Sequence, residues 1–289
     1  MTLKLFADSA CDLPLSFYEE NNVELITLQV HIDDQEYQDL QNIQPEQVYE
    51  EIRAGKMPKT SQASPQRLQE LFTDLAKSGE SGLYIAMSSG LSGTYQTAVM
   101  VKNQVKEQFP DLDLTIIDSK AVSLGYGMTV MALAERIKNN ESKEDIIKFA
   151  QSNCDRMEHL FTIEDLEFLA AGGRLSRSSA FFGGLLNIKP LLHIEEGKLV
   201  PLEKIRGKKK LLKRMLDLME ERGIDLENQL IGICHGDDEE TALVMKKMIE
   251  ERFGTKSFYI RLIGAIVASH AGPGTLAVFF LKKPRFDIG

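Results

Sequence analysis

Several residue types that would mark a particular class of protein are scarce in this chain of 289 residues. Cysteine occurs only at Cys11, Cys154 and Cys234, and no two of these form a CxxC pair. Neither a zinc ribbon nor a disulfide framework is therefore expected, and a reducing cytoplasm fits this usage. No apolar run reaches the roughly 18 residues that a membrane span needs. The N-terminus meets Asp8 too early for a signal peptide.

Positive charge is also in short supply. The formal net charge is −9 at pH 7, which argues against nucleic acid as a partner. One basic block, from Lys204 to Arg214, is the local exception. It is either a solvated helix face or a docking patch for an acidic partner or a phosphate product.

The first half of the chain alternates apolar runs with amphipathic segments. We predict strands at 3–7, 23–30, 82–87 and 112–117, and helices at 13–21, 44–55, 65–77, 95–109, 125–139 and 142–153. Asp12 and Ser64 stand where helix caps are expected, and the polar stretch 33–42 is expected to be a loop. Repeated strand-then-helix units imply a parallel sheet with helices on both faces, a three-layer α/β domain.

The second half has a different rhythm, with short strands joined by both hairpins and helices. We predict strands at 160–163, 190–195, 199–205, 230–235, 257–262 and 276–282, and helices at 165–170, 178–186, 208–222 and 238–253. This pattern favours a second α/β domain with a mixed sheet. The chain length also suggests two domains. We place the boundary near Met157, giving an N-terminal domain of residues 1–157 and a C-terminal domain of residues 158–289.

The segment Ser88–Thr94 is the most informative part of the chain. It contains two glycines and four hydroxyl residues, and it lies where a buried strand passes into a helix. Capping alone would explain Ser92 or Thr94, but this composition exceeds what one cap requires. The glycines, Gly93 among them, allow close backbone approach. The helix start offers unpaired N–H groups, so the turn is suited to a phosphate or a carboxylate.

Two further clusters carry polar groups on small-residue segments. Thr60–Pro65 places hydroxyls, including Ser61, before a helix, where a plain cap is the simpler interpretation. Gly264–Thr275 surrounds His270 with small residues and glycines. His270 is either a packed core residue or an imidazole that could donate to an anion or titrate near neutrality. In parallel sheets, ligands bind beyond the carboxyl ends of the strands, where Ser88–Thr94 is expected to lie.

Several mechanisms are excluded by spacing. The chain has no P-loop, no complete dinucleotide fingerprint and no G-x-S-x-G elbow, and its histidines show no metal-ligand spacing. A triad of Ser92, His270 and Asp8 is conceivable, so a serine esterase or hydrolase remains an alternative. A phosphate- or sugar-phosphate-binding module is a third.

Taken in order, the motifs of this chain resemble the DegV family of bacterial fatty-acid-binding proteins over essentially its whole length. The matching segments are Asp8–Pro14, Thr60–Pro65, Ser88–Tyr95, Asp118–Ser119, Leu166–Ser176, Asn187–Leu191 and Ser269–Gly274. The resemblance implies a two-domain α/β fold with one long-chain fatty acid in a buried tunnel. It also implies a carrier without catalysis or cofactor of its own. A separate ATP-dependent fatty acid kinase would phosphorylate the presented carboxylate to an acyl phosphate, a step toward phospholipid synthesis.

The resemblance also assigns residues. By motif position, Thr60, Ser92 and His270 would contact the carboxylate, with Ser61, Gly93 and Thr94 beside them. Arg206 would contact the kinase or the new phosphate. A transient contact with a membrane surface would fit a lipid carrier.

The chemistry of these residues supports the resemblance. A carboxylate removed from water needs several donors, or its desolvation cost dominates. Two hydroxyls, a helix start and an imidazole would supply them without a full counter-charge. About 14 methylenes at ~0.8 kcal/mol each contribute on the order of 11 kcal/mol before association costs, provided that a tunnel encloses them. The candidate tunnel residues are Phe168, Leu169, Phe181, Phe182, Leu185, Leu186, Ile188, Leu191, Ile266 and Val267.

Overall fold

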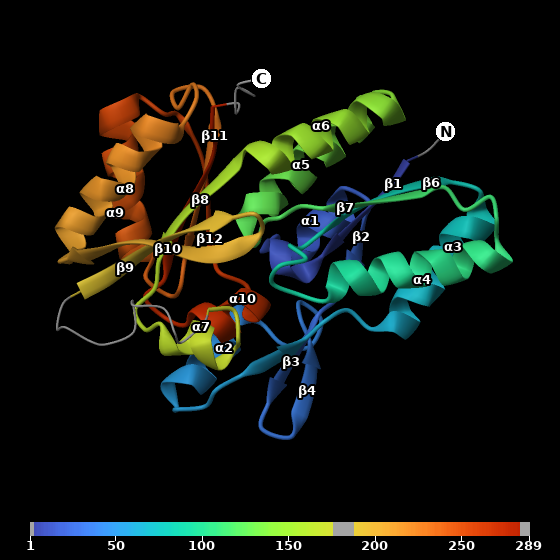
Figure 1. The fold of residues 1–289 in the computed structure, drawn as a ribbon, viewed down its shortest axis with the longest axis horizontal. Coiled ribbons are helices and arrows are strands. Elements are labelled where there is room, and N and C mark those ends of the chain that lie inside the picture. The colour runs from blue at the N-terminus through green and yellow to red at the C-terminus, as the bar shows by residue number, and fades with distance from the viewer. Residues whose placement is uncertain (1–2, 176–187, 284–289) are drawn as a thin grey trace.

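The computed structural model describes residues 3–175 and 188–283. These residues form a four-stranded parallel sheet, a six-stranded mixed sheet and a small three-stranded antiparallel sheet (Figure 1). The helix predicted at 178–186 lies outside the described residues.

The parallel sheet has the strand order β2-β1-β6-β7. Its strands are β1 (Leu3–Asp8), β2 (Val23–Ile26), β6 (Ser81–Ala86) and β7 (Leu114–Asp118). Side chains alternate between its faces, as a strand requires. On β1, Phe6 packs toward α3 (Pro65–Ser78) and α4 (Thr94–Gln108), whereas Leu5 and Ala7 pack toward the core that contains α5 (Leu124–Lys138). The predicted parallel sheet with helices on both faces is confirmed.

The mixed sheet has the order β10-β9-β8-β13-β11-β12. Its strands are β8 (Met157–Thr162), β9 (Ile188–Glu195), β10 (Lys198–Arg206), β11 (Leu230–His235), β12 (Ser257–Leu262) and β13 (Leu276–Leu281). Only β11 and β12 pair in parallel. Helices α8 (Lys208–Arg222) and α9 (Glu239–Phe253) cover one face (Figure 1). The prediction of a second α/β region with a mixed sheet is confirmed.

Helix α5 joins the two large sheets. It packs on β1 of the parallel sheet and on β8, β11 and β13 of the mixed sheet. Its residues from Leu124 to Val130 are all buried, as expected for a helix that is covered on both sides. Helix α6 (Lys143–Arg156) packs against it and leads into β8.

The small sheet was not predicted. The expected strand at 23–30 is instead two strands, β2 and β3 (Gln29–Ile32), because the chain leaves the parallel sheet at Leu28, whose N–H donates to Ser9 Oγ at 3.2 Å. The expected loop at 33–42 contains β4 (Gln35–Gln38), which pairs with β3; β5 (Lys59–Ser61) lies on the other side of β3. Strand β4 is polar and mostly exposed, so it carries no apolar alternation that would reveal it.

The role predicted for Asp12 as a helix cap is wrong. Helix α1 (Leu15–Glu20) begins after Pro14, and α2 (Pro45–Arg53) is the next helix. Asp12 instead has a φ of 58°, and its buried carboxylate accepts a hydrogen bond from Ser123 Oγ. The predicted cap at Ser64 is confirmed, because its side chain accepts from Arg67 N at 3.4 Å.

Two short helices complete the part of the fold that matters for function. They are α7 (Glu167–Ala171) and α10 (Ala265–Ala271). Helix α10, which was not predicted, contacts α7, α2, β3 and β5. It therefore brings the His270 segment against the small sheet. No helix of the described residues is long and apolar enough to cross a membrane.

Candidate functional site

A largely apolar cavity lies where loops of the parallel sheet, the small sheet and the mixed sheet meet. It encloses about 800 Å³ of space not occupied by atoms, including its opening to solvent. Its lining residues are Leu28, Thr60, Ser61, Met87, Leu91, Ser92, Val122, Ser123, His159, Phe161, Leu169, Arg174, Leu199, Ile263, Ile266, Val267, His270, Ala271, Thr275, Ala277 and Phe279. Thirteen of these 21 residues are apolar, so the cavity is suited to a ligand that is mostly hydrocarbon with a polar end.

Two of the predicted site residues form a hydrogen-bonded pair on this cavity. Thr60 Oγ1, on β5, lies 2.7 Å from His270 Nε2, on α10, although 210 positions separate them in sequence. Ser61 also lines the cavity, and its Oγ lies 2.7 Å from His31 Nε2 on the neighbouring strand β3. The small sheet thus delivers two hydroxyls to the cavity.

The third predicted residue, Ser92, lines the same cavity from the turn before α4. Its Oγ lies 2.9 Å from Thr94 Oγ1 and accepts from Thr94 N at 3.2 Å. Thr94 is fully buried, and its hydroxyl accepts from Ala63 N at 3.2 Å. Gly93 faces the end of the Gln62 side chain, which would have to shift to admit a Cβ. Thr94 therefore joins the two hydroxyl segments, and neither Thr94 nor Gly93 lines the cavity.

His270 is neutral in this structure. Burial, and then the positive charge of Arg174, lowers the pKa of His270 to about 4. The expectation that His270 titrates near neutrality is therefore wrong. Its Nδ1 atom has no hydrogen-bond partner within the described part of the chain.

Arg174 is a cavity residue that the sequence analysis did not single out. Its Nε donates to Leu91 O at 3.1 Å and its Nη1 donates to Gly172 O. Burial lowers its pKa, and no carboxylate of residues 3–175 or 188–283 forms an ion pair with it. A guanidinium keeps its charge under such conditions. The cavity thus carries a full positive charge in addition to the neutral groups that the sequence analysis named.

The Gly172-Gly173-Arg174 sequence contained a signal for this arrangement. A Cβ at Gly172 would lie 2.2 Å from His270 Nδ1, so only glycine lets the end of α7 approach the imidazole this closely. The glycine pair therefore places Arg174 beside His270. The sequence shows the glycines but not what approaches them.

The arrangement excludes the triad. His270 pairs with Thr60, whereas the nearest hydroxyl partner of Ser92 is Thr94. The carboxylate of Asp8 accepts from Tyr84 OH and Met87 N, both at 2.9 Å, and from Tyr126 OH at 2.5 Å. An esterase mechanism needs the carboxylate, imidazole and serine in one chain of hydrogen bonds, and here each has other partners.

Other predicted residues are distributed differently. Of the candidate tunnel residues, Leu169, Ile266 and Val267 line the cavity, whereas Phe168, Ile188 and Leu191 do not. Phe181, Phe182, Leu185 and Leu186 lie outside the described residues. Arg206 is exposed at the last position of β10, a strand whose Leu199 reaches the cavity. A metal centre finds no support in the described ranges, which hold no group of three metal-ligating side chains.

Comparisons with known proteins agree with this fold. Residues 2–283 match the family model described as "Uncharacterised protein, DegV family". A DegV domain-containing protein of Clostridium perfringens is 38% identical over 284 residues, which cover 97% of this chain and 98% of that protein. Protein DegV of Bacillus subtilis is 32% identical over 285 residues, covering 98% of this chain and 100% of that protein.

Solved structures are similar over nearly the full length. A DegV family protein from Thermus thermophilus, described in terms of fatty acid binding, has a TM-score of 0.86 at 28% identity, covering 98% of this chain and 100% of that chain. DegV from Bacillus subtilis, described as a fatty acid binding protein, has a TM-score of 0.84 at 31% identity with the same coverage.

Proposed function

Since this chain belongs to the DegV family, we propose that it binds a long-chain fatty acid in the cavity described above. The carboxylate lies among Thr60, Ser92, Arg174 and His270, and the alkyl chain lies along the apolar walls. Its relatives from Thermus thermophilus and Bacillus subtilis are described as binding fatty acids, which supports this assignment.

One observation carries the proposal: hydrogen-bonding groups from four distant segments gather on a cavity whose remaining lining is mostly apolar. A carboxylate there gains a guanidinium and several neutral donors, which offset the cost of its desolvation. Because His270 is neutral, its imidazole acts through a hydrogen bond, and Arg174 supplies the charge.

The second part of the proposal concerns what happens to the bound acid. The chain acts as a carrier that presents the carboxylate to a separate ATP-dependent kinase for acyl-phosphate formation, and it has no catalytic role alone. The exposed Arg206 is a candidate contact for that kinase or for the phosphate. The division at Met157 into two domains, with the cavity between their loops, remains our assignment.

The first experiment is mass spectrometry of an organic extract of the purified protein, followed by titration of the delipidated protein with a fluorescent long-chain acid. A copurifying long-chain acid, and binding that unlabelled acid displaces, are expected. A lipid-free protein that takes up no such acid would refute the proposal. Inorganic phosphate should not displace the probe, which separates this function from that of a phosphate-binding module.

The kinase step needs its own test. With an ATP-dependent fatty acid kinase added, the wild-type protein should support acyl-phosphate formation, and Ser92→Ala and His270→Ala should slow it. Unchanged turnover in both variants would contradict the roles of these side chains. A fluorophosphonate probe should label none of the three proteins, because the described geometry contains no activated serine.

A further inference from the structure

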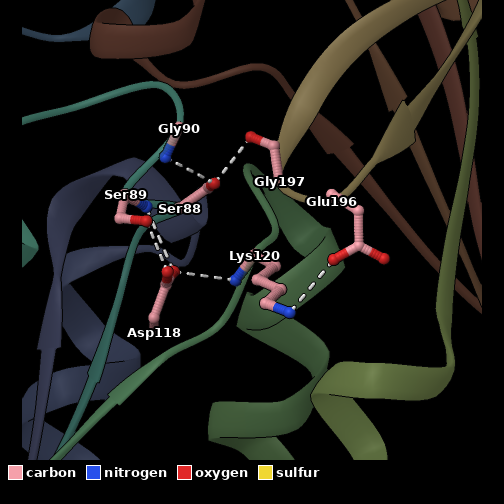
Figure 2. Close-up of polar contacts among 7 residues, drawn as sticks. All are labelled: Ser88, Ser89, Gly90, Asp118, Lys120, Glu196 and Gly197. Carbon is pink, nitrogen blue, oxygen red and sulfur yellow. Dashed lines mark hydrogen bonds and ion pairs between the residues drawn. The ribbon is translucent and has the colours of Figure 1, made fainter.

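The tip of the β9–β10 hairpin meets the loop that follows β6. Figure 2 shows this contact, in which Gly197 of the tip lies against Ser88 and Gly90, while the neighbouring Glu196 faces Lys120. Ser88 Oγ donates to Gly197 O at 2.7 Å and accepts from Gly90 N at 3.1 Å. Ser88 is completely buried. One hydroxyl therefore joins the mixed sheet to the parallel sheet.

The close approach depends on glycine on both sides. A Cβ at Gly90 would lie 2.6 Å from Gly197 O, and a Cβ at Gly197 would lie 2.5 Å from Ser88 Oγ. Gly197 also has a φ of +78°, which other residues rarely adopt. The sequences on the two sides of the contact are thus matched to each other.

Ser88 is also the residue on which the turn that carries Ser92 is built. Its carbonyl oxygen accepts from Leu91 N at 3.0 Å and from Ser92 N at 3.1 Å, and its own N–H donates to Ala121 O at 2.9 Å. Ser88 does not line the cavity, whereas Leu91 and Ser92 do. A shift of Ser88 would therefore move two cavity residues.

The same hairpin reaches the cavity through Leu199, two positions after Gly197. On the opposite side of the turn, Arg174 donates to Leu91 O. The turn is thus held by the mixed-sheet half of the molecule at two points, Ser88 and Leu91. Within the parallel sheet it is anchored by Ser89, whose N and Oγ donate to Asp118 at 3.1 and 2.5 Å (Figure 2).

We propose that Ser88 and Gly197 form a positioning pair through which the hairpin tip fixes the carboxylate-binding turn in the orientation that Ser92 needs. This inference rests on the proposed function, because it concerns the affinity for the acid head group. Neither residue touches the ligand. Their contact restricts the turn before the ligand arrives, so that less freedom is lost on binding.

An exposed ion pair at the same tip provides a matched control. Lys120 Nζ lies 3.3 Å from Glu196 Oε2, and both side chains are more than half exposed. Exposed ion pairs of this kind contribute little to the free energy of unfolding. Lys120→Ala therefore perturbs the hairpin tip without affecting the buried hydrogen bond.

The test compares two ligands of the same chain length, a fatty acid and the corresponding fatty alcohol, on the wild type, Ser88→Ala, Gly90→Ala and Lys120→Ala. Ser88→Ala removes the hydrogen bond, and Gly90→Ala displaces the Gly197 carbonyl. Loss of one neutral hydrogen bond corresponds to about five-fold in affinity. We expect that loss for the acid with Ser88→Ala, a larger loss with Gly90→Ala, and changes under about two-fold for the alcohol in both. Lys120→Ala should match the wild type for both ligands.

The outcomes distinguish a failure of this inference from a failure of the proposed function. A wild type that binds neither ligand would refute the proposed function. If the wild type binds the acid, and both Ser88→Ala and Gly90→Ala bind it with the affinity of the wild type, the positioning role would be overturned. Equal losses for acid and alcohol would also overturn it, because they would indicate a general structural defect. Thermal unfolding identifies any variant that is not folded. The acid and alcohol affinities of the variant that does fold then decide whether the pair has a positioning role.

Discussion

The two large sheets contribute different things to the cavity. The parallel sheet, with the small sheet beside it, supplies hydroxyls from short segments: Ser92 from the loop after β6, and Thr60 and Ser61 from β5. The mixed sheet supplies apolar walls from β8, β10 and β13. The segments next to it supply Arg174, which follows α7, and His270, which lies on α10. The hydroxyls thus come from one half of the molecule, whereas the guanidinium and the neutral imidazole come from the other.

This difference shows that the head-group cluster, which consists of Thr60, Ser92, Arg174 and His270, depends on long-range packing. Ser92 lies in the turn that follows β6, and Thr60 and Ser61 lie on β5, so distinctive local sequences carry these hydroxyls. Arg174 and His270 reach the cluster only because α7 and α10 pack against each other and α10 packs on the small sheet. Substitutions in one half, or at the contact between the halves, should therefore have effects of different size.

The largest effect is expected from Gly125→Ala, which disrupts the contact between the parallel-sheet half and the mixed-sheet half. A Cβ on Gly125 of α5 would lie 1.9 Å from Nε2 of His159, a fully buried side chain on β8. Overpacking of a rigid ring at this site should cost about 3 kcal/mol of the free energy of unfolding, measured by chemical denaturation. Gly79→Ala, at an open site with a φ of +71°, is the control and should cost about 1 kcal/mol. Similar losses in the two variants would contradict this explanation.

Replacement of Arg174 by Met tests whether the mixed-sheet half supplies the charge. Loss of a charged hydrogen-bond donor to the carboxylate costs about 1.5–3 kcal/mol, so the affinity for the fatty acid should fall about 10- to 100-fold. Binding of the fatty alcohol, followed by the same fluorescence displacement, should change much less. If Arg174→Met keeps the acid affinity of the wild type, Arg174 does not supply the charge that binds the carboxylate.

Asp12→Asn tests the link between the N-terminal segment and α10, because the Asp12 carboxylate lies against Gly264 at the start of that helix. Burial raises the pKa of Asp12 to about 7. A raised pKa in an acid means that the folded state holds the proton more tightly than the unfolded chain. The stability from this group is therefore present at low pH and is lost as pH rises through about 7.

The wild type should consequently lose about 1 kcal/mol relative to Asp12→Asn between pH 6 and pH 8. Asparagine tolerates the positive φ at this position. Asp39, whose pKa is raised to about 7 by burial and also by the charge of Asp12, is present in both proteins, so the difference reports Asp12 together with its coupling to Asp39. Denaturation curves at pH 6, 7 and 8 measure it, and a constant difference across these values would contradict the prediction.

The smallest effect is expected from Thr60→Val, which removes one neutral hydroxyl from the parallel-sheet side. The fatty-acid affinity should fall by a few-fold, corresponding to about 1 kcal/mol. Thr73→Val, on α3 away from the cavity, should leave the dissociation constant unchanged. If Thr60→Val weakened binding more than Arg174→Met, the division of roles between the two halves would be wrong.

Much of this fold could be predicted from the sequence, because its elements follow local rules. The parallel sheet follows from alternating apolar strands and periodic helices, and the Ser64 cap follows from a serine before a first-turn proline. Strand β4 and helix α10 were missed for a common reason. Each is short, and each is stabilised by tertiary neighbours and not by its own residue pattern.

The candidate site shows the same limit. Thr60, Ser92 and His270 stand in distinctive local sequences, and all three line one cavity. Arg174 was missed because the two glycines before it indicate a close approach but do not show that His270 is the group approached. The lowered pKa of His270 likewise depends on burial and on Arg174, and both result from distant packing.

The position of β13 within its sheet has a consequence for biosynthesis. This strand, Leu276–Leu281, lies between β8 and β11, although it is the last strand of the described chain. A ribosome-bound chain lacking it would leave β8 and β11 unpaired on their facing edges. Because Ala277 and Phe279 of this strand line the cavity, the cavity is complete only after the C-terminal strand has paired with both neighbours.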